Sequence, residues 1–314
     1  MKVLYIIGKG RSGSTLLDNL LGQLDGFFSG GELMRLWSWG LVEGYACGCG
    51  LPVRDCRMWR SVMDTFAALM GDEEWSPERL VELERKVVGW RHGIRLLRRR
   101  PGGRSGWPSL DAYTLAMARL YLAIAKVSGA RVVVDSSKLP IHPTALGLVP
   151  DTDVYLVHLV RDPRAVVRSW KRRKEWTDRQ GQSEMPRYGV AYSMASWVAR
   201  NLVAEVVKGR MGLGRSMLVR YEDFVARPRE ALQEIARLVG EEAGRLPFLA
   251  DRSVRLDPTH TVGGNPTRLE TGRVEVVADE EWRLGLSRTD LWLATLLGLP
   301  LLRRYGYGVG TSGR

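Results

Sequence analysis

KVLYIIGKGRSGSTLLDNLLGQL, residues 2–24, places a strand, a glycine-rich turn and a helix in direct succession. Residues 2–7 are apolar and β-branched, which is typical of a buried strand in a parallel sheet. Residues 14–24 repeat apolar side chains at helical spacing. Between them, GKGRSGST (8–15) matches the phosphate-binding consensus G-x-x-x-x-G-K-[ST] at its first and third glycines and its final threonine. This succession predicts an anion site at a helix N-terminus.

The turn departs from that consensus in its charge. Ser14 stands where the consensus has Lys, and the cation is Arg11, three residues earlier. An ATP-binding loop needs its Lys for the β- and γ-phosphates and a metal for the triphosphate. Backbone N–H groups with the hydroxyls of Ser12, Ser14 and Thr15 instead suit a single anionic group. We therefore expect a phosphate site that requires no metal.

The rest of the chain alternates between strand and helix patterns. Strands are predicted at 130–138, 153–162 and 215–223, and helices at 163–176, 188–209 and 227–240. This order predicts an α/β fold with a parallel, doubly wound sheet flanked by helices. Residues 54–128 read as a helical insertion over the active-site cleft. Because the sheet resumes after the insertion, we expect one domain over 1–314, with a flexible tail at 305–314.

Composition limits the class of protein. The chain has 314 residues, of which 45% are hydrophobic. It has no apolar run long enough to span a bilayer, and its apolar start is too short for a signal peptide, so we expect a soluble cytoplasmic protein. The net charge of +12 predicts an anionic ligand, nucleic acid or an anionic surface as partner.

Polar segments follow each predicted strand. They comprise residues 10–15, 135–138, 161–169 and 220–223. Ligands of parallel sheets bind beyond the carboxyl ends of the strands, so these segments should meet in one crevice. Arg161 and Ser169 are eight residues apart, which lets a strand end and the second turn of the next helix contact one group.

These motifs resemble the sulfotransferases that use 3′-phosphoadenosine 5′-phosphosulfate (PAPS), which have a fold like that of the P-loop NTPases. Their [KR]-S-G-[ST]-T motif for the 5′-phosphosulfate corresponds to residues 11–15 here, and their closing loop resembles HTVGGNPTR (260–268), as in bacterial members. The resemblance implies a set of donor-binding residues. The loop contributes Arg11, Ser12, Gly13, Ser14, Thr15 and Leu16, and the 3′-phosphate is bound by Arg161 and Ser169. Tyr221 lies near the adenine, and Arg268 is the cation of the closing loop.

The resemblance also implies the catalytic residues. The tyrosyl-protein sulfotransferases have a Glu base 21 residues after the loop Arg, and Glu32 lies 21 residues after Arg11 (32 − 11 = 21). Cytosolic members have a His base in a segment that reads SSKLP here, with Lys138 in its place. We expect Glu32 to be the base, with Lys138 and Arg11 stabilising the leaving oxygen. Lys138 as the base, and Glu32 as an ordinary helix N-terminal carboxylate, are the alternatives. Met34 departs from the Arg that those enzymes have two residues after the base.

Cysteine and histidine offer further candidates. Cys47, Cys49 and Cys56 could form a zinc knuckle without its fourth ligand, a zinc site closed by a His, or a disulfide with one thiol left over. No His lies nearby in the sequence, so we expect a structural role without metal. His142 is expected in a turn, and His260 in the closing loop could contact donor or acceptor.

Aromatic side chains could contribute to acceptor binding. Candidates to stack on a sugar or aromatic acceptor are Trp37, Trp39, Trp107 and Trp176, with packing as the alternative for each.

The expected activity is in-line transfer of the sulfuryl group from PAPS to a hydroxyl of a small molecule or glycan, which releases 3′-phosphoadenosine 5′-phosphate (PAP). No metal and no nucleic acid are expected to take part. Two alternatives remain: a kinase-like phosphotransferase, which would need Mg²⁺, and a non-catalytic basic module that binds nucleic acid through 91–104 and 161–174.

Overall fold

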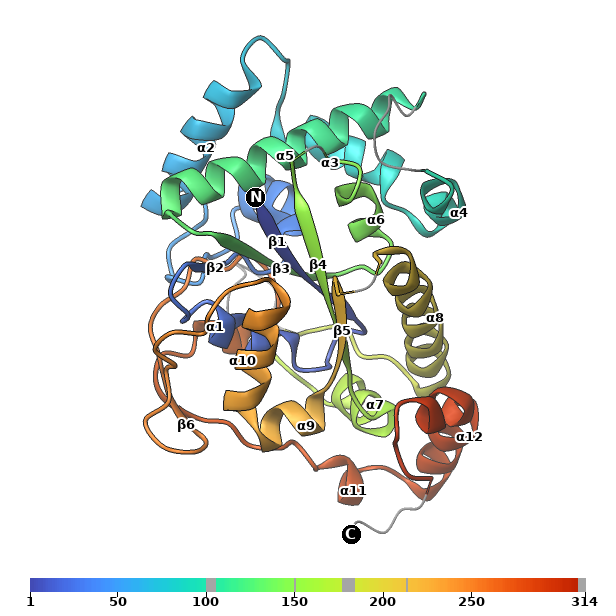
Figure 1. Cartoon of the computed structure of the whole chain (residues 1–314). Helices are drawn as coiled ribbons and strands as arrows, with labels where there is room; N and C mark the ends of the chain where they lie inside the picture. Colours follow the sequence, from blue (N-terminus) through green and yellow to red (C-terminus); the bar gives the residue numbers. More distant parts are fainter. Residues whose placement is uncertain (100–105, 150, 177–183, 213, 310–314) are drawn as a thin grey trace.

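A computed structural model describes residues 1–99, 106–149, 151–176, 184–212 and 214–309. Its centre is a five-stranded parallel sheet in the order β2-β3-β1-β4-β5 (Figure 1). The strands are β1 Lys2–Gly8, β2 Phe27–Ser29, β3 Val132–Lys138, β4 Asp153–Val160 and β5 Ser216–Arg220. The predicted α/β fold with a parallel sheet is confirmed. The short strand β2 was not predicted.

The central strand β1 is buried on both faces. Val3, Tyr5 and Ile7 pack into one apolar cluster, whereas Leu4 and Ile6 pack into a second cluster on the opposite face. This is the reason for the unbroken apolar run in the sequence, because side chains of a strand alternate between its faces.

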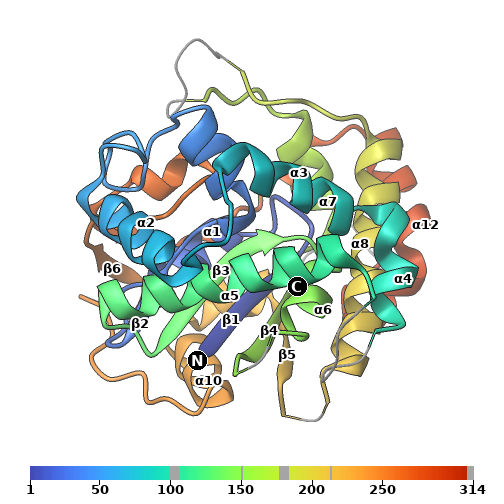
Figure 2. The same ribbon diagram turned by 90° about the horizontal axis from the view of Figure 1, so that it is seen from above.

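The insertion forms a helical layer on one face of the sheet. Its helices are α2 Arg57–Met70, α3 Pro77–Val87, α4 Gly93–Leu97 and α5 Pro108–Ser128. Helix α5 packs against α2, α3 and β3 (Figure 2). The other face carries α1 Ser14–Leu21 and α10 Pro228–Leu238. The sheet is therefore covered on both sides, as its composition requires.

A third group of helices packs around the carboxyl end of strand β4, at Val160. It comprises α7 Pro163–Lys171, α8 Val190–Arg210 and α12 Arg288–Arg304, which share an apolar cluster. Helix α7 ends before the predicted residue 176, and α12 was not predicted. The other α-helices are α6 His142–Leu146, α9 Tyr221–Ala226 and α11 Trp282–Gly285, and β6 Ser253–Leu256 forms an antiparallel pair with β7 Gly272–Glu275.

Two predicted segments need correction. Residues 221–223 begin helix α9 rather than ending a strand, so Tyr221 lies at the junction of β5 and α9. In the expected flexible tail, Tyr305 and Tyr307 are buried, and the Tyr307 hydroxyl donates to Glu222 Oε2 at 2.7 Å. Packing against β4 and α9 therefore orders the chain here, while 310–314 lie outside the described residues. Among the described helices, none is both long and apolar enough to cross a membrane.

Candidate active site

A cavity of about 540 Å³ opens at the carboxyl ends of the parallel strands. Most of the predicted site residues line it: Arg11, Gly13, Ser14, Thr15, Leu16, Glu32, Lys138, Arg161, Ser169 and Tyr221. Ser12 and Arg268 do not line it, and neither does any described residue of 54–128. The strand ends bring together groups from across the chain, as the parallel topology predicts.

The loop after β1 is held in a conformation that needs glycine. Gly13 has φ 88°, and a Cβ there would come within 2.4 Å of the Tyr221 ring. Arg11 also has a positive φ, of 74°. Helix α1 begins at Ser14, and the backbone N–H groups of its first turn have no partner within the helix. The residues of this turn, Ser14, Thr15 and Leu16, line the cavity, which makes it a place for an anion. The Ser12 hydroxyl is buried and has no hydrogen-bond partner among the described residues.

Two cations of this loop lie against one indole. Arg11 Cζ is 4.8 Å and Lys9 Nζ 4.9 Å from the centre of the Trp170 ring. Lys9 also donates to Ser196 Oγ at 2.9 Å. Burial, together with the nearby charges of Arg200 and Arg11, lowers the pKa of Lys9 to about 8. Burial, with the charge of Arg172, lowers the pKa of Arg11 to about 10. Closely spaced cations destabilise one another's charge, and a bound anion would relieve this.

Arg161 stands at the end of β4 and is 5% exposed. Its Nη1 donates to the Arg11 carbonyl at 3.1 Å, and its Nη2 lies 3.0 Å from Asp279 Oδ2. Its guanidinium covers the Tyr221 ring at 4.4 Å. The side chain thus links the loop after β1 to the junction of β5 and α9. Ser169, on α7, lines the same cavity.

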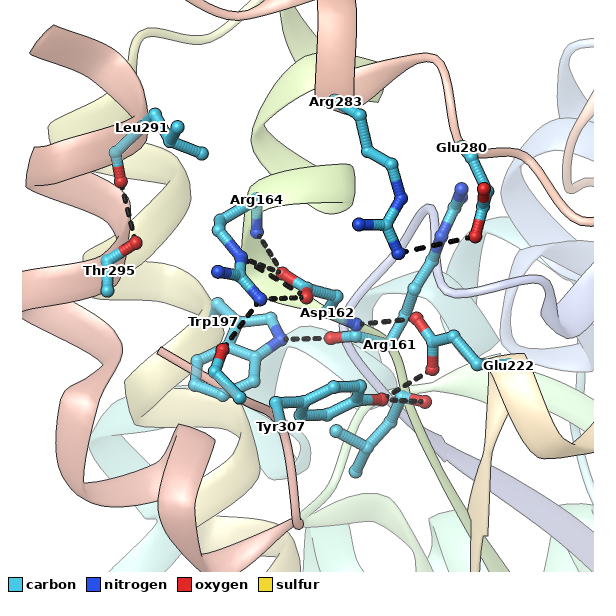
Figure 3. A network of polar contacts seen from close by, with 12 residues as sticks. Arg161, Asp162, Arg164, Trp197, Glu222, Glu280, Arg283, Leu291, Thr295 and Tyr307 are labelled. Atoms are coloured by element: carbon cyan, nitrogen blue, oxygen red, sulfur yellow. Dashed lines mark hydrogen bonds and ion pairs between the residues drawn. The ribbon is translucent and has the colours of Figure 1, made fainter. Parts of the chain in front are cut away.

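A polar network holds the backbone at Arg161 and Asp162 (Figure 3). Trp197 Nε1 donates to the Arg161 carbonyl at 3.1 Å, and the Asp162 N–H donates to Glu222 Oε1 at 3.0 Å. Arg164 Nη2 donates to Asp162 Oδ2 at 2.6 Å and to the Gly308 carbonyl at 3.0 Å. The C-terminal segment therefore fixes the strand end that carries Arg161, a role that its glycine-rich sequence gave no sign of.

Glu32 and Lys138 form an ion pair inside the cavity. Lys138 Nζ is 2.5 Å from Glu32 Oε1, and each side chain is 14% exposed. Lys138 also donates to the Ser136 carbonyl at 3.0 Å. It has φ 65°, an uncommon backbone conformation for a residue other than glycine. The two candidates for the base are thus in direct contact, with Lys138 next to the Glu32 carboxylate that could accept a proton.

The position of Glu32 depends on a distant segment. Strand β2 ends just before it, and the Glu32 N–H donates to the Val262 carbonyl at 2.7 Å. The Val262 N–H in turn donates to the Gly30 carbonyl at 3.0 Å. A Cβ on Gly31 would come within 2.5 Å of the Val262 carbonyl oxygen, so this close pairing needs glycine.

Two buried carboxyl groups lie beneath the ion pair. Burial raises the pKa of Asp18 to about 7 and that of Asp135 to about 6. Asp135 accepts from Tyr121 Oη at 2.6 Å, and Asp18 accepts from Ser136 Oγ at 3.0 Å. These bonds hold the end of β3, which carries Lys138. Neither Asp lines the cavity, so both are positioning residues.

Arg268, expected as the cation of the closing loop, lies outside the cavity lining. Its side chain is 2% exposed, and it donates to the Thr261 carbonyl at 3.1 Å and the Ala46 carbonyl at 2.6 Å. Buried carbonyls need such donors, so the guanidinium joins two backbone segments. Gly264, Asn265 and Thr267 of the same loop do line the cavity.

The histidine and tryptophan candidates are also sorted by position. His142 is buried between Tyr113 and Tyr5, and burial lowers its pKa to about 3, so it is a neutral core residue. His260 lies among the cysteines, away from the cavity lining. Trp37 and Trp107 are buried in the core, so they pack there and are not available to stack on an acceptor. Trp39 and Trp176 line the cavity, with ring centres 6.2 Å apart.

Sequence reasoning missed several cations of the lining, namely Lys9, Arg35, Arg172, Lys174 and Arg200. Lys9 lies two residues before Arg11 and was within reach of motif analysis. Arg200 lies on α8, whose packing beside β1 cannot be read from local sequence. Together these cations give the cavity a strongly positive wall.

Known proteins resemble this chain in sequence. A family model described as the sulfotransferase family matches residues 4–243. Human carbohydrate sulfotransferase 3 is 34% identical over 101 residues, which cover 29% of this chain and 21% of that protein. Rat carbohydrate sulfotransferase 1 is 27% identical over 176 residues, which cover 52% of this chain and 41% of that protein. The chain thus spans well under two thirds of the length of these curated relatives.

Solved structures share the fold. The sulfotransferase domain of the Synechococcus PCC 7002 olefin synthase superposes with a TM-score of 0.55 at 20% identity, over 98% of this chain and 95% of that one. The sulfotransferase domain of the curacin biosynthetic pathway gives a TM-score of 0.51 at 16% identity, over 98% and 99%. At such identities the likeness concerns the fold alone.

Proposed function

The chain belongs to the sulfotransferase family, and from this premise we propose that it transfers a sulfuryl group from PAPS to an acceptor hydroxyl. The observation that carries the proposal is the contact between Glu32 and Lys138, at 2.5 Å, in the same cavity as the helix N-terminus after β1. A base and a cation are thereby next to an anion nest, which is what transfer between two oxygen atoms requires.

Donor binding uses the two anion-binding elements. The backbone N–H groups at the start of α1, with Ser14 and Thr15, bind the 5′-phosphosulfate. Arg161 and Ser169 bind the 3′-phosphate. Asp279 is the anion that Arg161 contacts here, and a phosphate group can replace it as partner. The Tyr221 ring, beneath Arg161, lies near the adenine.

The transfer step follows from the ion pair. Glu32 accepts the proton of the acceptor hydroxyl while the acceptor oxygen forms a bond to sulfur. The bond between sulfur and the bridging oxygen of the 5′-phosphate breaks, and its electron pair stays on that oxygen. Arg11 and Lys138 stabilise the resulting negative charge, and the products are a sulfate ester and PAP. The chain supplies position and charge for this step, without a metal.

A sugar hydroxyl is the acceptor that we favour within this class. Trp39 and Trp176 present two indoles in the cavity lining, and aromatic faces suit the apolar faces of sugars. The curated relatives, named as carbohydrate sulfotransferases, support the same choice.

The nucleic-acid alternative has less support. Basic residues on or just after α7 pair with acidic residues of this chain: Arg164 with Asp162, Lys171 with Asp290, Arg172 with Glu281, and Arg173 with Glu184. The neighbouring carboxylates reduce the net positive charge that this surface offers to a phosphate backbone. Part of the other candidate segment, 100–104, lies outside the described residues.

Ligand-dependent stabilisation tests the proposal. PAP at a hundredfold excess over its Kd should stabilise the protein by about 2.7 kcal/mol, whereas AMP, ADP and ATP at the same concentration should give much less. Radiolabelled sulfuryl transfer from PAPS to a panel of sugars should proceed in buffer without Mg²⁺. Equal stabilisation by ATP, or a requirement for Mg²⁺, would favour the phosphotransferase.

A further inference from the structure

Three cysteines and one histidine from distant parts of the chain converge at one point. The ligand-capable atoms of Cys47, Cys49, Cys56 and His260 all lie within 4.8 Å of one another. The three thiols are free, and the sulfurs of Cys49 and Cys56 are 3.7 Å apart, too far for a disulfide bond. His260 is 204 residues from Cys56, which explains why the sequence showed no fourth ligand.

We propose that these four residues form a structural Zn²⁺ site of the Cys₃His type. The spacing of the ligand atoms supports this assignment. A tetrahedral zinc ion with Zn–S of about 2.3 Å and Zn–N of about 2.0 Å holds two sulfurs about 3.8 Å apart, and a sulfur and a nitrogen about 3.5 Å apart. The corresponding separations are 3.7 Å for the two sulfurs above, 3.6 Å from Cys47 Sγ to His260 Nδ1, and 3.3 Å from Cys56 Sγ to His260 Nδ1.

The backbone around the first two cysteines forms a tight turn. The Cys47 N–H donates to the Leu51 carbonyl at 2.7 Å, and the Gly50 N–H donates to the Cys47 carbonyl at 2.9 Å. Gly50 has φ 87°, which a turn of this kind assigns to glycine. The turn therefore presents Cys47 and Cys49 on one side, as zinc knuckles do.

The segment that carries His260 is fixed against this turn. The Gly48 N–H donates to the Thr261 carbonyl at 2.9 Å, and a Cβ on Gly48 would lie 2.6 Å from the Thr259 carbonyl oxygen. Trp59 Nε1, one turn after Cys56, donates to the His260 carbonyl at 2.9 Å. Such contacts around a metal site orient its ligands.

Charge is consistent with the assignment. Three thiolates and a neutral imidazole around Zn²⁺ carry a net charge of −1, since metal binding removes the three thiol protons. Arg268 donates to the carbonyls of Ala46 and Thr261, each one residue from a ligand. A buried arginine at this place offsets that charge, and the site gives a reason for its burial.

The site also has a consequence for the cavity. Val262, two residues after His260, pairs with both Cys47 and Gly31, and its carbonyl accepts from the Glu32 N–H at 2.7 Å. The zinc ion thus fixes the segment around Val262, to which the backbone of Glu32 is hydrogen-bonded. It lies outside the cavity lining and takes no part in the transfer step, so this inference stands independently of the donor and acceptor.

Metal content is the first test. Protein expressed with zinc in the medium and purified under reducing conditions should contain one Zn²⁺ per chain by elemental analysis. A mercurial thiol reagent should release it in proportion to the thiols modified. Less than about 0.1 Zn²⁺ per chain, both as purified and after reconstitution with ZnCl₂, would overturn the assignment. A Cys49–Cys56 disulfide, two hydrogen masses lighter by mass spectrometry, would do the same.

Variants make the test specific to the four ligands. Cys49→Ser and His260→Ala should lose the zinc, and His260→Cys should keep it, because a Cys₄ set also binds zinc tetrahedrally. His92→Ala, at a half-buried histidine outside the four-residue cluster, is the matched control and should keep it. Full zinc content in His260→Ala would contradict the assignment. Should these variants fail to fold, the metal content of the unaltered chain still decides.

A second readout reports on the structural role. Removing zinc from the unaltered protein should lower Tm by roughly 5 °C or more, since metal binding free energy adds to folding free energy. Amide exchange at Glu32 and Val262 should accelerate at the same time, while exchange in β4 should not. Unchanged Tm and exchange after complete zinc release would show that the ion does not support this segment.

Discussion

Arg161 and Arg268 are both buried arginines beside the same cavity, but their guanidinium groups have different surroundings. Arg161 belongs to the wall formed by β4 and α7, lines the cavity and pairs with the carboxylate of Asp279. Arg268 belongs to the closing segment, residues 259–269, and donates to two main-chain carbonyls. Arg161 also donates to the main-chain carbonyls of Arg11 and Asp279, at 3.1 and 2.9 Å, so it differs from Arg268 in having in addition a carboxylate partner and a place in the cavity lining.

The difference teaches how to separate binding from structure in a basic protein. Losing a guanidinium that serves a ligand lowers affinity for that ligand, and the loss of Arg161 would in addition leave the Arg11 and Asp279 carbonyls without this donor. Losing one that satisfies buried carbonyls leaves those carbonyls without donors, which costs stability. The β4–α7 wall and the closing segment should therefore respond differently to substitution, and the following predictions test this.

The largest effect is expected at Glu32, which the closing segment holds in place. Glu32→Gln keeps size and hydrogen bonding but cannot accept a proton, so turnover should fall by about 10²–10⁴-fold. PAP affinity should change by less than about threefold, because the base does not hold the donor. Steady-state kinetics and PAP titration measure the two quantities.

Lys138 provides the counter-test for the identity of the base. Lys138→Arg should retain part of the rate if Lys138 only neutralises the leaving oxygen. It should be inactive if Lys138 is the base, since the pKa of arginine is far too high. Near-normal turnover in Glu32→Gln together with an inactive Lys138→Arg would reverse the assignment.

Arg161 should give the next largest effect, on affinity. Arg161→Ala should weaken PAP binding by about 2–4 kcal/mol, or roughly 30- to 1000-fold, as the loss of a charge-assisted contact does. Binding of AMP, which lacks the 3′-phosphate, should hardly change. Calorimetric titration with both ligands measures this, and equal losses for both would mean that Arg161 is structural.

Arg268 is the matched substitution in the closing segment. Arg268→Ala should lower the free energy of unfolding by about 2–4 kcal/mol, because two buried carbonyls lose their donor. The PAP affinity of the folded protein should fall by less than about threefold. Urea denaturation and titration below the transition check the two parts. A selective loss of PAP relative to AMP would return Arg268 to the phosphate site.

The smallest effect concerns the pH dependence of donor binding through Lys9. Because its folded pKa is about 8, Lys9 is mostly charged at pH 7 and mostly neutral at pH 9. PAP affinity should therefore fall over this range, by at most about tenfold, and Lys9→Met should remove that part of the dependence. An identical pH profile in Lys9→Met would exclude Lys9 from donor binding.

The lowered pKa of Lys9 should make stability rise with pH, whereas it should make PAP affinity fall with pH. Lys9 has a folded pKa below its ordinary value of 10.5 because it is buried, so the unfolded chain binds more protons between pH 8 and 10.5. The contribution of Lys9 to stability should accordingly rise with pH through that window. Comparing the unfolding of the unaltered protein and Lys9→Met at pH 7.5 and 10 isolates it.

Much of the fold was predictable because its signals are local. The apolar run of β1, the glycine turn and the helix after it set the central strand and the nest in one stretch of 23 residues (24 − 2 + 1 = 23). Arg161 and Ser169 were found from the spacing between neighbouring elements, and Glu32 from the resemblance to a known family; all three line the cavity. The roles assigned to them stay predictions.

Other features could not be predicted because they depend on pairing across the chain. Strand β2 has three residues, too few for a periodic signal, and is a strand because it pairs with β3. Tyr307 lies in a glycine-rich tail and is buried by the partners that it finds in Glu222 and β4. The sequence predicted a cation at Arg268 but not its partners, which are the main-chain carbonyls of Thr261 and Ala46.

The sequence by itself determined the parallel sheet, the anion nest and the family resemblance, since each rests on residues close together along the chain. Only the tertiary structure decided that Glu32 contacts Lys138, that Arg268 faces the backbone, and that His260 joins Cys47, Cys49 and Cys56. The physical reason is that hydrogen-bond and metal geometries act over about 2–4 Å in space. Separation along the chain says nothing about such distances until the sheet and its loops bring the segments together.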